Sequence, residues 1–178
     1  MNSPFVFNVA QLLRGETMPE QRTQTGPAPA RIGVEMIAIK KGDDVTVDAT
    51  LTPLGTGILV DADVTGTLTG ECSRCLAELH PPLDVHVSQF FAADEDSITG
   101  DPEDEADAGS GDETPIINID ELDLLQTVID EVGLTLPFNP TCEGECVNEV
   151  PTAEGVTTGI SGEEERVDPR WSGLEKFL

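Results

Sequence analysis

Apolar and polar residues alternate along the first half of the chain. Three runs share this pattern: Ile32, Val34, Met36 and Ala38, then Val45, Val47, Ala49 and Leu51, and then Ile58, Val60, Ala62, Val64 and Leu68. A period of two is typical of strands with one buried face, and the Gly- and Asp-containing sequences between the runs favour hairpins. A fourth run spans residues 83–91, with His86 on its outer face. We therefore expect an antiparallel β-meander or a partly closed, barrel-like sheet.

The clearest helical pattern comes after residue 119. Leu122, Leu125, Val128, Ile129 and Val132 recur at helical spacing, with Asp120 as a candidate N-cap and Gly133 after the last apolar position. An amphipathic helix usually packs on its own core, so we expect this one on the sheet. The predicted fold class is α+β: one sheet packed with one main amphipathic helix, with long acidic disordered loops.

The polar segments are interpreted as loops and tails of a single domain, residues 1–178. Residues 3–15 combine a short β-like run with a helical turn, which we interpret as a docking arm. Gly and Pro among polar residues predict a linker or loop at residues 16–30. Residues 94–113 contain ten acidic side chains and no basic one, which predicts a disordered acidic insertion. The insertion is a solvated spacer in the simplest interpretation and a bait for a basic partner in the other.

The C-terminal region combines a polar stretch with a distinctive end. Residues 147–167 are Gly-rich and acidic and are predicted to form a flexible segment. Residues 168–178 contain Trp171, the only Trp of the chain. Because a Trp side chain can bury a large area, this stretch is a candidate docking tail. A tail that folds back onto its own domain is the alternative.

Composition narrows the classes of function. The formal charge is −26, from 35 acidic and 9 basic residues. Such a charge disfavours binding to phosphates or anionic lipids and favours a basic protein partner, although acidity that serves only solubility is an equal alternative. No stretch has the ~18 to 20 apolar residues of a membrane span, and the first ten residues do not form a signal peptide. We expect a cytoplasmic protein that binds neither a membrane nor a small-molecule substrate.

Four cysteines form two closely spaced pairs. Cys72 and Cys75 give C-x2-C, and Cys142 and Cys146 give C-x3-C, with 66 residues between the pairs. Two such pairs can supply four thiolates to a structural zinc ion. Glu143 and Glu145 disfavour this arrangement because carboxylates repel thiolates. Four reduced thiols are the alternative, so zinc is the one cofactor that the sequence suggests, as a hypothesis.

The sequence offers no evident catalytic group. The two histidines, His80 and His86, are expected in a turn and on an exposed strand face. The carboxylates are concentrated in the acidic insertion, where their geometry would not be fixed. Motifs of serine hydrolases, phosphate-binding loops and zinc proteases are absent from the sequence. We therefore predict a non-enzymatic binding protein.

Three motifs together resemble the YceD family of large ribosomal RNA subunit accumulation proteins. They are residues 70–76 (GECSRCL), residues 120–142 (from DELDL to LTLPFNPTC) and residues 168–171 (DPRW). The resemblance implies a role in ribosome biogenesis, specifically in 23S rRNA accumulation, and family genes commonly neighbour that of a large-subunit ribosomal protein. Many members have two further cysteines after the position of Cys146. This chain has none, so a zinc site would need Cys72 and Cys75.

The leading hypothesis is therefore a large-subunit assembly factor that binds a basic ribosomal protein or another pre-ribosomal component. Its candidate partner-binding residues lie in the three motifs: Arg74, Leu136, Pro137, Asp168, Arg170 and Trp171. The alternatives are a zinc-stabilised interaction module and a protein that binds rRNA directly. Direct rRNA binding would require Arg74, Arg166, Arg170 and the Lys40–Lys41 pair to converge.

Overall fold

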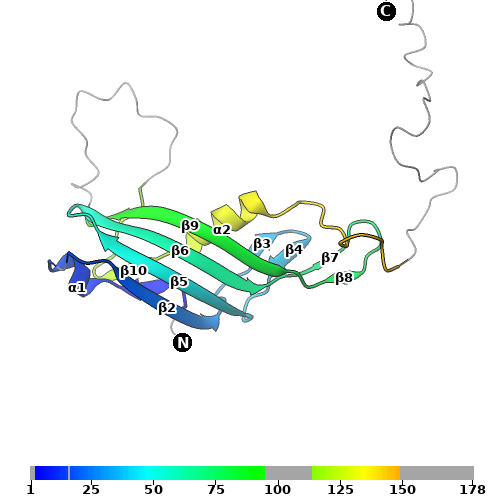
Figure 1. Ribbon diagram of the computed structural model, residues 1–178, viewed down its shortest axis with the longest axis horizontal. Coiled ribbons are helices and arrows are strands. Elements are labelled where there is room, and N and C mark those ends of the chain that lie inside the picture. Colours follow the sequence, from blue (N-terminus) through cyan, green and yellow to red (C-terminus); the bar gives the residue numbers. More distant parts are fainter. Residues whose placement is uncertain (1–2, 16, 95–113, 149–178) are drawn as a thin grey trace, which may run out of the picture.

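The computed structural model describes residues 3–15, 17–94 and 114–148, which form an α+β fold of antiparallel strands and one main helix (Figure 1). Its largest sheet has the strand order β2-β5-β6-β9, with all neighbours antiparallel. These strands are β2 (Glu20–Pro27), β5 (Asp44–Pro53), β6 (Gly57–Thr67) and β9 (Pro82–Ala92). The long runs predicted at residues 45–51, 58–68 and 83–91 are therefore confirmed as strands.

Two smaller sheets complete the fold. One has the order β3-β4-β7-β8 and the other pairs β1 with β10. Their strands are β1 (Val6–Asn8), β3 (Ile32–Val34), β4 (Ile37–Ile39), β7 (Thr69–Glu71), β8 (Glu78–Leu79) and β10 (Glu121–Asp123). The three sheets are not closed, so the barrel-like alternative is wrong. The meander prediction is also incomplete, because the chain leaves the main sheet twice to build the β3-β4-β7-β8 sheet.

The core lies on one face of the main sheet. Alternate side chains of β5, β6 and β9 are buried there, among them Val47, Val60 and Val85, as period-two alternation requires. Helix α2 (Leu125–Thr135) packs against β3 and β9 and buries Val128 and Val132. The prediction of a core-packing helix is therefore confirmed.

The start of the predicted helix is wrong. Residues 121–123 form β10, which pairs with β1 in the register Phe7↔Leu122. Asp120 is therefore not the N-cap, and the Asp123 carboxylate accepts a 2.9 Å hydrogen bond from the Leu125 N–H. The helix also passes through Gly133 and ends at Thr135. The apolar spacing did not distinguish a short strand followed by a helix from one longer helix.

The N-terminal segment is part of the core, which corrects the docking-arm interpretation. Phe5, Phe7 and Val9 are fully buried, and Leu12 of helix α1 (Ala10–Leu13) is nearly so. Their side chains join the same cluster as the main sheet and α2. A β-like run followed by a helical turn was correctly expected here, but its apolar residues face inward.

The prediction of a linker or loop at residues 16–30 is wrong over β2. This strand forms an eight-residue ladder with β5, from Glu20↔Leu51 to Pro27↔Asp44. It is an edge strand of polar residues whose side chains bond across the ladder, as between Thr25 and Thr46 at 2.9 Å. Because β2 carries no hydrophobic alternation, backbone pairing alone identifies it. Apart from Asp94, Val147 and Asn148, the acidic insertion (94–113), flexible segment (147–167) and docking tail (168–178) lie outside the described residues.

Candidate metal centre and adjoining groove

The β7–β8 hairpin and the segment after α2 lie together at one end of the molecule (Figure 1), and the four cysteines meet there. Cys72 and Cys75 lie in the turn that joins β7 to β8, and both are buried. Cys142 and Cys146 lie on the segment that follows α2 and are half-buried. All four sulfur atoms lie within 4.8 Å of one another. Two pairs that are 66 residues apart in sequence therefore form one cluster.

The sulfur geometry fits a tetrahedral zinc site. With Zn–S bonds of about 2.3 Å, tetrahedral thiolates are about 3.8 Å apart. The Cys75 and Cys142 sulfur atoms are 3.6 Å apart. This separation is far longer than the roughly 2.05 Å of a disulfide bond. The arrangement of the four cysteines is thus compatible with a structural zinc ion.

Backbone groups of the β7–β8 turn favour a thiolate at Cys72. Burial raises the pKa of this thiol, but hydrogen bonds from the backbone N–H groups of Cys75, Arg74 and Cys142 outweigh burial and lower the pKa to about 6. The pKa of Cys146 is instead raised to about 11, by burial and by the neighbouring Cys75 and Cys72 sulfurs. Without a cation the cluster cannot hold four thiolates, whereas a divalent metal offsets their repulsion.

Hydrogen bonds hold the two cysteine segments together independently of a metal. The Ser73 N–H donates to the Pro140 carbonyl at 2.8 Å, and the Asn148 side chain donates to the Cys75 carbonyl at 3.1 Å. The backbone N–H of Asn148 is also the main cause of the lowered pKa of Cys75. Segment 136–148 is therefore positioned on the β7–β8 turn so that its thiols face those of the turn.

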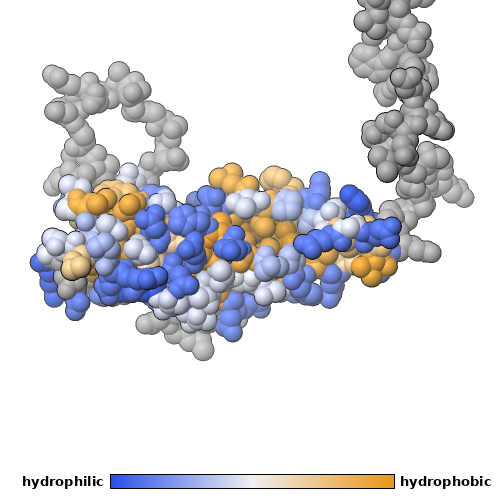
Figure 2. All heavy atoms as spheres, viewed as in Figure 1, coloured by the Kyte–Doolittle hydropathy of each residue, from blue (hydrophilic) through white to orange (hydrophobic). Residues whose placement is uncertain are grey.

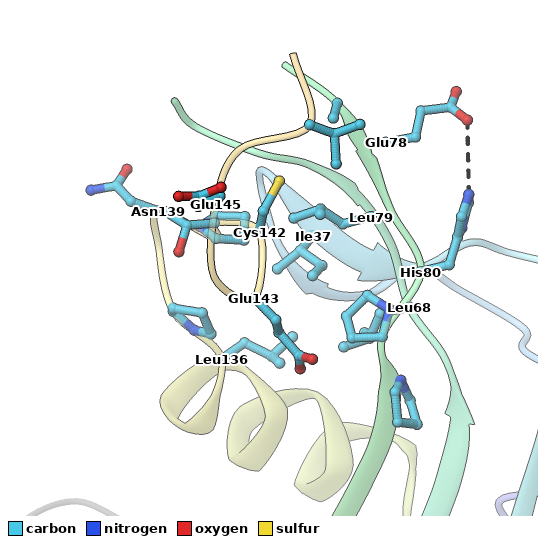
Figure 3. A pocket seen from close by; sticks show the side chains of 17 residues that line it. Ile37, Leu68, Glu78, Leu79, His80, Leu136, Asn139, Cys142, Glu143 and Glu145 are labelled. Atoms are coloured by element: carbon cyan, nitrogen blue, oxygen red, sulfur yellow. Dashed lines mark ion pairs between the residues drawn. The ribbon is translucent and has the colours of Figure 1, made fainter. Parts of the chain in front are cut away.

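A groove of about 710 Å³ adjoins the cysteine cluster (Figure 3). One wall is residues 77–82, which include β8, and the other is the segment from Leu136 to Val147. Buried Ile37 and Leu68 and half-buried Leu79 and Leu136 form its apolar floor. Its acidic side chains are Glu78, Glu143 and Glu145, and none of its described lining residues is Lys or Arg. Figure 3 shows Glu143 extending across the groove between Leu136 and Leu68.

Apolar side chains also gather on the surface around this end. Figure 2 shows hydrophobic surface over α2 and beside the β7–β8 hairpin. Leu134 and Phe138 are 85% and 77% exposed, and Leu76 and Val147 are also largely exposed. Exposed apolar side chains that cluster, rather than occurring singly, mark interaction surfaces.

The candidate partner-binding residues fall into three groups. Leu136 and Pro137 line the groove. Arg74 is exposed in the turn between Cys72 and Cys75. Asp168, Arg170 and Trp171 lie outside the described residues. The sequence missed Glu78 and Leu79, because a two-residue strand has no detectable periodicity.

The outer face of the main sheet carries a second concentration of acidic residues. Asp48, Asp61, Asp63 and Asp84 alternate with the buried positions of β5, β6 and β9. Some of this charge is engaged locally: Asp63 lies 2.8 Å from the His86 ring, and Asp61 accepts a 2.6 Å hydrogen bond from Ser88. His86 thus lies on the outer face, as the sequence predicted.

The segments that carry the four cysteines match a known protein family. The profile of the family described as "Large ribosomal RNA subunit accumulation protein YceD" matches residues 60–178, which include all four cysteines. The chain belongs to the YceD family. The family name links this YceD protein to accumulation of the rRNA of the large ribosomal subunit.

Relatives of this YceD protein occur in several bacteria. An uncharacterized protein of Mycobacterium tuberculosis is 34% identical over 99% of this chain and 82% of its own length. One of Mycobacterium leprae is 32% identical over 99% of this chain and 78% of its own. YlbN of Bacillus subtilis is 29% identical over 66% of this chain and 64% of its own. No solved structure matches the chain significantly. Neither helix in the described part of the chain is long and apolar enough to cross a membrane.

Proposed function

We propose that this YceD protein is a non-enzymatic factor of large-subunit assembly that supports 23S rRNA accumulation by binding a basic ribosomal protein. The observation that carries the proposal is the formal charge of −26 in a chain of this family. An acidic surface attracts basic ribosomal proteins over long distances and raises their association rate. It also competes with rRNA for them, so a bound protein stays soluble until it is delivered.

The experiment is affinity purification of the tagged full-length chain from its own cells at low and at high salt. Bound proteins are identified by mass spectrometry and bound RNA by sequencing. We expect large-subunit proteins at low salt, retained after nuclease treatment and released at high salt, because exposed charges are screened. Retention of 23S rRNA precursors that persists after the proteins are stripped would instead favour direct rRNA binding. Absence of any salt-sensitive large-subunit protein would contradict the proposal.

A zinc ion held by Cys72, Cys75, Cys142 and Cys146 is the second part of the proposed function. The sulfur separations support it, because they suit a tetrahedral metal site. With four protein ligands the ion has no open position for substrate, so its role is structural. It would fix the segment after α2 against the β7–β8 hairpin and thereby hold the two walls of the groove.

A further inference from the structure

The groove beside the cysteine cluster combines two features that recognise one kind of ligand. Its floor is apolar, whereas Glu78 on one wall and Glu143 and Glu145 on the other supply carboxylates. Glu78 is exposed, and its side chain makes a long contact, 3.8 Å, with exposed His80. A ligand with alternating apolar and cationic side chains would satisfy both the floor and the walls.

Strand β8 gives the groove an open backbone edge. It ends the β3-β4-β7-β8 sheet, and its only strand partner in the described chain is β7. Residues 77–82, which include β8, form one continuous wall of the groove. An extended peptide can add to such an edge through main-chain hydrogen bonds while neighbouring pockets select its side chains.

From these observations we propose that the groove binds an extended, basic segment of a large-subunit ribosomal protein. The apolar residues of the bound segment lie over Leu79 and Leu136, and the Lys or Arg residues of that segment pair with Glu78, Glu143 and Glu145. This assignment rests on the proposed function and names the surface that performs it. A polyanion is a poor occupant, because three carboxylates and no described Lys or Arg line the groove.

The test uses full-length protein and fluorescent 15-residue synthetic peptides that tile the large-subunit ribosomal proteins of the same cell. Two double variants with the same change in net charge are compared with the wild type. Glu78→Lys with Glu143→Lys reverses one charge on each wall of the groove. Asp63→Lys with Glu121→Lys is the control, since both residues are exposed and lie outside the groove lining. Zinc content and thermal melting show whether each variant keeps its fold.

We expect basic peptides to bind the wild type near physiological salt. The groove variant should bind them about tenfold or more weakly, and the control variant within about threefold, because distant charges are screened. Leu79→Ser, which removes floor contacts without a charge change, should weaken the same peptides. Leu79→Ser therefore tests whether the peptides bind in the groove even if Glu143→Lys disturbs the neighbouring thiolates.

Other outcomes would overturn the assignment in distinguishable ways. If both double variants weaken peptide binding equally, the groove is not the binding site. Salt-sensitive partner binding, and hence the proposed function, would still hold. A full-length chain that binds neither peptides nor whole large-subunit proteins would contradict both. Preferential binding of a peptide of residues 149–178 would assign the groove to this chain's own C-terminal segment. If the wild type sediments as a dimer and the groove variant as a monomer, the groove binds a second copy of the chain. If the wild type binds a 23S rRNA fragment and the groove variant does not, the groove binds RNA.

Discussion

At the scale of single residues, the proposed zinc site can be tested by removing one of its four cysteines. Replacing Cys142 by Ser removes one of four thiolates without changing the shape of the site greatly. We expect zinc content to fall from about one ion per chain to a small fraction after dialysis against a chelator, because the ligand set is then incomplete. Elemental mass spectrometry of purified protein measures it. Ser73→Ala, an exposed position in the same turn, is the control and should keep the metal.

Gly70 of β7 packs closely against Ile37 of β4, a residue of the groove floor, and a methyl group on Gly70 has no space. A Cβ on Gly70 would lie 2.5 Å from the Met36 carbonyl oxygen and 2.8 Å from the Ile37 Cβ, so β4 and β7 would have to separate. We expect Gly70→Ala to lower the free energy of unfolding by about 1 to 3 kcal/mol. Denaturant titration checks this, and an unchanged midpoint would contradict the close packing of the two strands.

Replacing Gly133 by Ala should stabilise the protein, in contrast to the same substitution at Gly70. Gly133 lies inside α2, and nothing lies within 4 Å of the position its Cβ would take. Gly133→Ala should raise the free energy of unfolding by roughly 0.5 to 1 kcal/mol, because alanine loses less conformational entropy in a helix. A loss of stability in the same titration would show that the helix does not extend through this residue.

At the scale of elements, the proposed metal holds a hairpin to a segment and does not hold the main sheet. Removal of zinc should therefore increase amide exchange in residues 70–79 and 136–148 and leave β5 and β6 protected, since the hydrophobic cluster of these strands does not include the cysteines. Hydrogen exchange with mass spectrometry measures both regions at once. Loss of protection throughout the main sheet would show that the metal stabilises the whole fold.

What the sequence reveals about these elements depends on burial. Strands β5, β6 and β9 each bury one face, so alternation located them nearly to the residue. Strand β2 was missed because its side chains are polar on both faces, and β8 because it has two residues. The alternation at residues 32–38 predicts one strand, but a turn at Glu35 and Met36 divides it into β3 and β4.

The candidate site, like the fold, could be predicted from the sequence only in part. Spacing identified all four cysteines and the two pairs, but only the fold brings Cys75 within 3.6 Å of Cys142. The apolar floor of the groove draws on β4, the chain between β6 and β7, β8 and the segment after α2. Contacts between segments so far apart in sequence leave no local pattern.

At the scale of the whole molecule, the proposed function assigns the choice of partner class to the net charge. The net charge of −26 should make association with a basic protein fast and salt-dependent while disfavouring naked nucleic acid. In the proposed function, the groove would supply specificity at one end of this acidic protein. Attraction would then come from the surface as a whole and recognition from a few side chains around Leu79 and Leu136.

The most direct test of this account is a side-by-side titration of the purified full-length protein with isolated large-subunit ribosomal proteins and with 23S rRNA free of protein. Binding is followed by fluorescence anisotropy over a series of salt concentrations. The account predicts that at least one basic ribosomal protein binds, with an affinity that falls steeply as salt rises, and that the naked rRNA does not bind. Binding of the rRNA as tight as that of any ribosomal protein would contradict it.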